Sequence, residues 1–171
     1  SQFSKRLNAD WQETFVAILD ELRPNKVRIV AYWEDIEKNE GSFNFSDLDW
    51  QMTELQKRNV KTIVVIGMRV PRWPECHIPN WANSLSAEDR ENKLKIYLEK
   101  IVERYQYYSV LESWQIENEP FLIFGECPGR GKNYLSNEIE LVKSIDPRRQ
   151  IIITDGGEFG TWYQSVKYGD I

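Results

Sequence analysis

Two carboxylates flank an amide where an apolar stretch of the chain ends, at Glu117, Asn118 and Glu119. Residues 110–116 before them are apolar enough to form a short buried strand. Pro120 lacks the amide hydrogen that a strand ladder needs, so the strand is predicted to stop here and to place Glu119 at its carboxyl end. A carboxyl group held in that position can serve as a general acid and then as a general base.

Other carboxylates compete with Glu119 for that role. If the strand ended one residue earlier or later, its inward-pointing and outward-pointing side chains would be exchanged. Glu117 is therefore the second candidate for the general acid/base. Asp155 and Glu158 follow another apolar stretch, and we expect them to be solvated loop residues. The alternative for Glu119 itself is a solvated carboxylate at the start of a helix, where a negative charge is favourable.

Helical and extended patterns alternate along the rest of the chain. Helices are predicted over residues 11–22, 46–55, 86–105 and 135–145, with a last one starting near residue 161, and strands over residues 27–33, 60–66, 110–116 and 150–154. Asp10, Ser46 and Ser86 are the expected N-caps. This alternation predicts a parallel sheet, either in a barrel or in a doubly wound fold.

Two features favour the barrel. No glycine-rich phosphate loop stands at a strand-to-helix turn, and long loops follow the strands predicted to end at residues 66 and 116, where barrel enzymes build their sites. We therefore expect an α/β fold, an incomplete (β/α)8 TIM barrel with about strands one to five present. Residues 1–171 would form a single domain, the amino-terminal part of the barrel, with residues 1–4 as the remnant of strand one. A complete barrel needs about 250 residues, so strands six to eight are expected outside these 171 residues.

The sequence Asn118-Glu119-Pro120 after an apolar strand resembles the acid/base motif of the clan A glycoside hydrolases, which are retaining (β/α)8 enzymes. The predicted strand 27–33 ends in two aromatic residues, and residues 41–50 are similar to the G-x-F-x-F-x-x-L-D turn that follows strand two in that clan. The similarity continues through residues 69–73 to Asp155, so it extends over nearly the whole chain.

The resemblance implies a glycoside hydrolase, similar to cellulase-like and β-galactosidase-like members, that cleaves β-glycosidic bonds of oligo- or polysaccharides with retention and without a cofactor. Retention requires two carboxyl groups about 5–5.5 Å apart. Glu119 would be the general acid/base. The nucleophile of the clan is a glutamate at the end of strand seven, outside this chain, so these residues alone are expected to be inactive.

The resemblance also implies roles for residues near the strand ends. Asn118 would hydrogen-bond the sugar 2-hydroxyl, although asparagine also serves as a turn amide. Arg28 would orient the nucleophile through its planar guanidinium, the alternative being a surface salt bridge. Trp33, at the end of the same predicted strand, is a further candidate for substrate binding.

The segment 69–81 is rich in proline and aromatic residues and predicts a stiff loop. Trp73 or Trp81 would offer a platform on which a sugar ring stacks, unless the loop packs on itself over the barrel rim. His77, the only histidine, is expected to be a hydrogen-bonding loop residue that can contact a sugar hydroxyl.

Cys76 and Cys127 lie in loops that follow neighbouring strands of the predicted barrel. A disulfide between them is sterically possible and would indicate an oxidising compartment, so an extracytoplasmic location is favoured. Two free thiols are the alternative. A zinc site that adds His77 would lack the usual paired C-x-x-C spacing, and we expect no metal.

The composition indicates which classes of binding partner to expect. The net charge of −5 offers no electrostatic footprint for nucleic acid, whereas seven Trp, eight Tyr and seven Phe suit the apolar faces of sugars. No stretch approaches the roughly 20 apolar residues of a membrane span. The expected partners are a carbohydrate substrate and the missing carboxyl-terminal half of the barrel.

Two other functions fit the same sequence. A carbohydrate-binding pseudoenzyme would keep the sugar site but lack the strand-seven glutamate. A non-carbohydrate α/β half barrel would bind no sugar and would associate through its open sheet edges.

Overall fold

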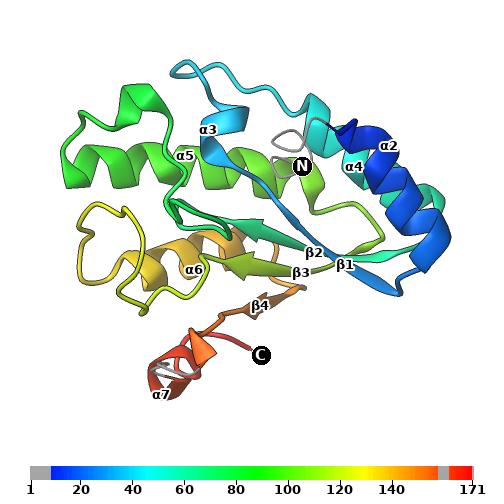
Figure 1. Ribbon diagram of the computed structural model, residues 1–171. Coiled ribbons are helices and arrows are strands. Elements are labelled where there is room, and N and C mark those ends of the chain that lie inside the picture. Colours follow the sequence, from blue (N-terminus) through cyan, green and yellow to red (C-terminus); the bar gives the residue numbers. More distant parts are fainter. Residues whose placement is uncertain (1–8, 158–161, 171) are drawn as a thin grey trace.

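The computed structural model describes residues 9–157 and 162–170. Within them, four strands form one parallel sheet (Figure 1). The strands are β1 (Lys26–Val30), β2 (Lys61–Ile66), β3 (Leu111–Ile116) and β4 (Gln150–Ile152). The helices are α2 (Trp11–Ala17), which continues as the π-helix η1 (Ile18–Leu22), α3 (Trp33–Ile36), α4 (Ser46–Lys57), the 3-10 helix η2 (Asn80–Ala82), α5 (Ala87–Tyr105), α6 (Tyr134–Ile145) and α7 (Trp162–Ser165).

The strands lie in the sheet in the same order as in the chain, β1-β2-β3-β4. A doubly wound sheet reverses its strand order at a switch point, whereas a (β/α)8 barrel adds each new parallel strand beside the last. Every connection between successive strands contains helix. The order is therefore that of a barrel.

The core forms where one face of the sheet packs on the helices. Ile29, Val64, Trp114 and Ile151 stand in register across the four strands, and all are buried. Figure 1 shows α5 and α6 side by side along the sheet, and these helices pack against each other. They contribute to the same apolar cluster as the strands.

The opposite face of the sheet is partly open. Side chains alternate between the two faces along a strand. The sequence neighbours of the core residues, such as Arg28, Ile63 and Ile152, therefore point to this second face. Arg28 is exposed, and Ile63 and Ile152 are half-buried. In a barrel this face is the interior, which is filled by side chains from strands on the far side.

Most element predictions are confirmed, and the differences have local causes. Asp10 accepts hydrogen bonds from the amides of Gln12 and Glu13, and Ser86 caps α5, as expected. The prediction that Ser46 caps α4 is wrong, because Asn44 Oδ1 accepts from the Ser46 amide instead. The predicted strand 27–33 ends at Val30, since Trp33 opens the short helix α3.

Some expectations fall outside the described residues, namely the remnant of strand one at residues 1–4 and the start of the last helix at residue 161. Among the described helices, none has the length and apolar character required to cross a membrane.

Candidate active site

The chain makes a tight left-handed turn directly after β3. Glu117 has a φ of 58° and Glu119 a φ of 48°, a conformation that costs a non-glycine residue free energy. Hydrogen bonds to both neighbouring strands hold it. The amide of Glu117 donates to Ile66 O (2.9 Å), and the amide of Glu119 donates to Thr154 Oγ1 (3.0 Å). The turn is thus fixed between the carboxyl ends of β2 and β4.

Glu117 points into the protein. Its Oε1 accepts from the Met68 amide (3.0 Å), and its Oε2 accepts from the Arg69 amide (2.6 Å). A Cβ atom at Gly67, whose φ is 128°, would lie 2.7 Å from Glu117 Oε1, so only glycine fits there. The Glu117 carboxylate is fully buried and joins the loop after β2 to the end of β3.

A buried charge cluster surrounds Glu117. Arg130 donates from Nη1 to Glu117 Oε1 (2.6 Å) and from Nη2 to Glu138 Oε1. Burial, and then the negative charge of Glu117, raise the pKa of the Glu138 carboxyl well above its usual value. One guanidinium therefore faces two carboxyl groups, and the second of them resists ionisation.

Glu119 contrasts with Glu117. Its side chain is half-buried, and its carboxylate forms no hydrogen bond or ion pair with any part of the chain that the structure describes. The carboxylate is consequently open to a ligand at the strand end.

Gln115 connects the remaining predicted residues of this site. Its Oε1 accepts from Arg28 Nη1 (3.1 Å), and its Nε2 donates to Asn118 Oδ1 (3.3 Å) and to Thr154 Oγ1 (3.2 Å). The structure therefore brings Arg28, Asn118 and Glu119 together, as expected from the sequence. Gln115 and Thr154 were missed, although a glutamine inside a buried strand was a signal that could have found the first.

The loops after β2 and β3 are joined above the site. Cys76 and Cys127 form a disulfide with their Cα atoms 5.2 Å apart, so the alternatives of two free thiols and of a zinc site are wrong. Arg69 adds hydrogen bonds from its guanidinium to Asn118 O (2.9 Å) and Phe124 O (2.8 Å). These contacts make one stiff rim from two loops.

Of the aromatic candidates, Trp73 is the most exposed. It is 52% accessible, and its ring contacts that of Phe124 at 5.7 Å between centroids. Trp81 is half-buried and donates from Nε1 to Glu37 O (2.8 Å). Trp73 therefore keeps exposed surface on which a sugar could stack, while Trp81 packs within its loop.

Two predicted substrate contacts are wrong because the residues are buried. Trp33 is fully enclosed in the core, where its Nε1 donates to Glu37 Oε2 (2.7 Å). His77 is 1% exposed, and its ring nitrogens lie 2.9 Å from Glu34 Oε1 and 3.0 Å from Arg72 O. Neither side chain can reach a sugar in this arrangement.

Asp155 is half-buried, and its Oδ2 accepts from Ser165 Oγ (3.1 Å) in α7, so it is not the solvated loop residue that the sequence led us to expect. Glu158 lies outside the described residues. The described residues contain no group of three or more His, Cys, Asp or Glu side chains placed to hold a metal ion.

Comparisons with known proteins point to glycoside hydrolases. No protein-family model matches the chain. A probable mannan endo-1,4-beta-mannosidase A of Aspergillus niger is 23% identical over 133 residues, which is 70% of this chain and 33% of that protein. The chain thus spans about a third of the length of this curated relative.

Solved structures show the same fold. The GH5_18 protein from Streptomyces cattleya in complex with GlcNAc matches with a TM-score of 0.66 and 15% identity, over 86% of this chain and 40% of that one. A psychrophilic family 10 endo-beta-1,4-xylanase matches with a TM-score of 0.62 and 20% identity, over 81% and 49%. The prediction of an incomplete TIM barrel is confirmed, and so is the resemblance to clan A glycoside hydrolases at the level of the fold.

Proposed function

We propose that this chain forms the part of a retaining glycoside hydrolase barrel that supplies the general acid/base, Glu119. The observation that carries the proposal is that two nearby carboxylates at one strand end differ in their partners. The Glu117 carboxylate accepts hydrogen bonds from the Met68 and Arg69 amides and from Arg130. The Glu119 carboxylate forms no hydrogen bond or ion pair with the described residues and is accessible to a ligand. A carboxylate at the carboxyl end of a barrel strand is where such enzymes place catalytic groups.

The reaction follows from a protonated Glu119 beside the bond to be cleaved. It protonates the glycosidic oxygen as the leaving group departs, and a second carboxylate attacks the anomeric carbon to form a glycosyl-enzyme. Glu119, now ionised, takes a proton from water, whose oxygen displaces the second carboxylate and regenerates it. Two displacements preserve the configuration. The second carboxylate belongs to a strand beyond the four described here.

Asn118 is oriented for a defined contact with the sugar. Gln115 Nε2 donates to Asn118 Oδ1, which fixes that atom as an acceptor and leaves Nδ2 as a donor. Nδ2 would donate to the sugar 2-hydroxyl, an interaction that strengthens at the transition state. Arg28, on the open face of the sheet, would hold the second carboxylate through the donors that Gln115 does not use.

The substrate class we propose is a β-linked oligo- or polysaccharide such as mannan or xylan. The support is that the similar proteins carry names for mannanase and xylanase activities. The disulfide between Cys76 and Cys127 supports an extracytoplasmic location, because disulfides persist in oxidising compartments.

The test compares two isosteric variants, Glu119→Gln and Glu117→Gln, in the complete protein that carries this sequence. Hydrolysis of mannan and xylan is measured by reducing-end release. Loss of a general acid/base lowers the rate about 100- to 10,000-fold, and we expect this for Glu119→Gln with sugar binding retained. Full activity of Glu119→Gln would overturn the assignment. Sugar binding without hydrolysis by the unaltered protein would identify a pseudoenzyme instead.

A further inference from the structure

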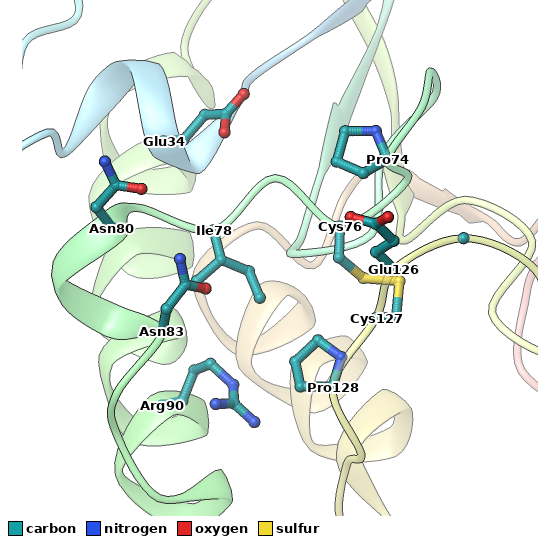
Figure 2. Close-up of a pocket in the computed structure, with 11 residues that line it drawn as sticks. Glu34, Pro74, Cys76, Ile78, Asn80, Asn83, Arg90, Glu126, Cys127 and Pro128 are labelled. Carbon is teal, nitrogen blue, oxygen red and sulfur yellow. A yellow bond between two sulfur atoms is a disulfide. The ribbon is translucent and has the colours of Figure 1, made fainter.

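A pocket is lined by residues of the loops after β2 and β3, including both cysteines of the disulfide. Its volume is about 540 Å³, within the range of small-molecule sites. Figure 2 shows it between Asn80, Asn83 and Arg90 on one side and the Cys76–Cys127 disulfide and Pro128 on the other. None of Arg28, Gln115, Asn118 and Glu119 lines it, so it is separate from the site described above.

Arg90 is the unusual member of this pocket. Its side chain, in the first turns of α5, is 7% exposed. Its guanidinium donates to two carbonyl oxygens, Leu85 O at 3.2 Å and Gly129 O at 3.5 Å, and it forms no ion pair with any carboxylate of the described residues. A guanidinium has five N–H donors, and a buried charge without a counter-charge is costly.

The other lining groups divide by chemistry. Asn83 places an exposed amide beside Arg90, and Asn80, also exposed, lies further along the same side toward Glu34. Ile78, Pro74 and Pro128 supply apolar surface. Glu34 and Glu126 lie at the end of the pocket away from Arg90, as Figure 2 shows. An anionic ligand group fits only the Arg90 end, and hydroxyl donors fit the end with the two glutamates.

We propose that this pocket binds a uronic acid, a sugar whose carboxylate pairs with Arg90. The planar guanidinium can take a carboxylate in two parallel hydrogen bonds, and the amide of Asn83 adds a donor beside it. The sugar hydroxyls donate to Glu34 and Glu126, and its C–H face lies on the proline and isoleucine side chains. That the anion is carried on a sugar rests on the proposed function, whereas the anion site itself rests on Arg90.

The test is a titration of the complete protein with D-glucuronate, D-glucose and acetate at equal ionic strength. Binding is followed by NMR through the side-chain amide signals of Asn80 and Asn83. We expect D-glucuronate to move these signals with higher affinity than either other ligand, since only it carries both groups. Equal affinity for D-glucose would overturn the anion site, and equal affinity for acetate would overturn the sugar assignment.

Variants test the contact itself. Arg90→Gln is expected to weaken D-glucuronate binding about tenfold, the usual effect of a lost charged hydrogen bond, while Arg148→Gln, at an exposed arginine outside the pocket, leaves it unchanged. If Arg90→Gln does not fold, Arg90→Lys and Asn83→Ala replace it. Asn83 is exposed, so its loss affects binding without affecting the core. Unchanged affinity in Asn83→Ala together with either Arg90 variant would overturn the proposal. Hydrolysis at Glu119 is measured separately, so either claim can fail alone.

Discussion

At the scale of single residues, the site depends on how one turn separates two carboxylates. Left-handed backbone at both Glu117 and Glu119 sends the first side chain inward to the loop after β2 and leaves the second open. The hydrogen bonds that the Glu117 and Glu119 amides donate to Ile66 O and Thr154 Oγ1 maintain this strained geometry. Strain of this kind persists only where the surroundings hold it, and it clusters at functional sites.

The two carboxylates should therefore differ in their effect on stability. Glu117→Gln turns an amide toward the Met68 or Arg69 N–H and removes a counter-charge of Arg130, so we expect a loss of about 2–4 kcal/mol in the free energy of unfolding. Glu119→Gln removes no hydrogen bond or ion pair to the described residues and should change the free energy of unfolding by less than about 0.5 kcal/mol. Urea unfolding of both variants checks this, and equal losses would contradict the described roles.

Thr154 should act as a positioning residue. Its hydroxyl oxygen accepts from both the Glu119 amide and Gln115, and Thr154→Val removes that acceptor without changing the volume. We expect kcat to fall about tenfold or more while KM changes little, because a misplaced catalytic group costs transition-state contacts. Thr154→Ser should restore most of the activity. Thr53→Val, on the exposed side of α4, is the control, and a fall in kcat there of the same size would point to a general loss of stability.

The sequence predicted correctly that Asn118 and Glu119 follow the end of a buried strand, because the apolar run and Pro120 are local signals, while their roles in catalysis and sugar binding stay predictions. The sequence-based prediction failed at Trp33 and His77, because exposure of an aromatic or imidazole ring is decided by tertiary packing. Trp33 is enclosed by Trp81 and Tyr97, which come from elements 48 and 64 residues away. No local pattern contains that information.

At the scale of elements, the buried cluster of Arg130, Glu117 and Glu138 joins the turn after β3 to α6. The raised pKa of Glu138 means that the folded state binds a proton more tightly than the unfolded chain does. Stability from this group is therefore fully present below the ordinary value of 4.5 and declines as the pH rises above it, toward the folded-state pKa.

Substitutions in this cluster should separate the effect of charge on the free energy of unfolding from the effect of packing. Glu138→Gln keeps an acceptor for Arg130 and removes the titrating group. We therefore expect that the decline in unfolding free energy that this residue causes above pH 4.5 disappears, and that the variant gains stability relative to the unaltered protein as the pH rises. Arg130→Met leaves Glu117 and Glu138 without a cation and should cost about 3–5 kcal/mol. Urea unfolding across pH measures both. A stability profile of Glu138→Gln identical to that of the unaltered protein would contradict the buried-carboxyl account.

The disulfide should stabilise the rim formed by the two loops. It closes a loop of 51 residues, for which removal of a native disulfide costs about 2–5 kcal/mol. We expect the double variant Cys76→Ser with Cys127→Ser to unfold at lower urea and to show a higher KM, because Trp73 and Phe124 lose a fixed separation. Loss of stability with an unchanged KM would show that the rim does not contact substrate.

Strands and helices were more predictable than their ends. The apolar run at residues 60–66 and the periodicity of α5 depend on local sequence alone, and both elements formed as expected. The end of β1 differs from the prediction. Tyr32 and Trp33 have strand propensity, but Tyr32 precedes and Trp33 begins a helical turn that buries Trp33 against Tyr97. Tertiary burial overrides propensity at such positions.

At the scale of the whole molecule, the sequential parallel sheet explains why the residues of the candidate site meet. Successive strands of a barrel end at the same rim, so residues far apart in the chain, such as Arg28, Asn118 and Thr154, approach one another. The open face that carries Arg28 is the interior of such a barrel. The chain spans 40% of the GH5_18 structure and 49% of the family 10 xylanase structure to which it is similar.

The most direct test of Glu119 as the acid/base is the reaction of Glu119→Ala in the complete protein with a dinitrophenyl β-glycoside and azide. Such a leaving group departs without protonation, and azide attacks the glycosyl-enzyme without a general base, so the account predicts azide-dependent turnover. NMR of the product should show a β-glycosyl azide, the outcome of two displacements. An α-glycosyl azide would contradict retention, and the absence of any azide effect would contradict the role of Glu119.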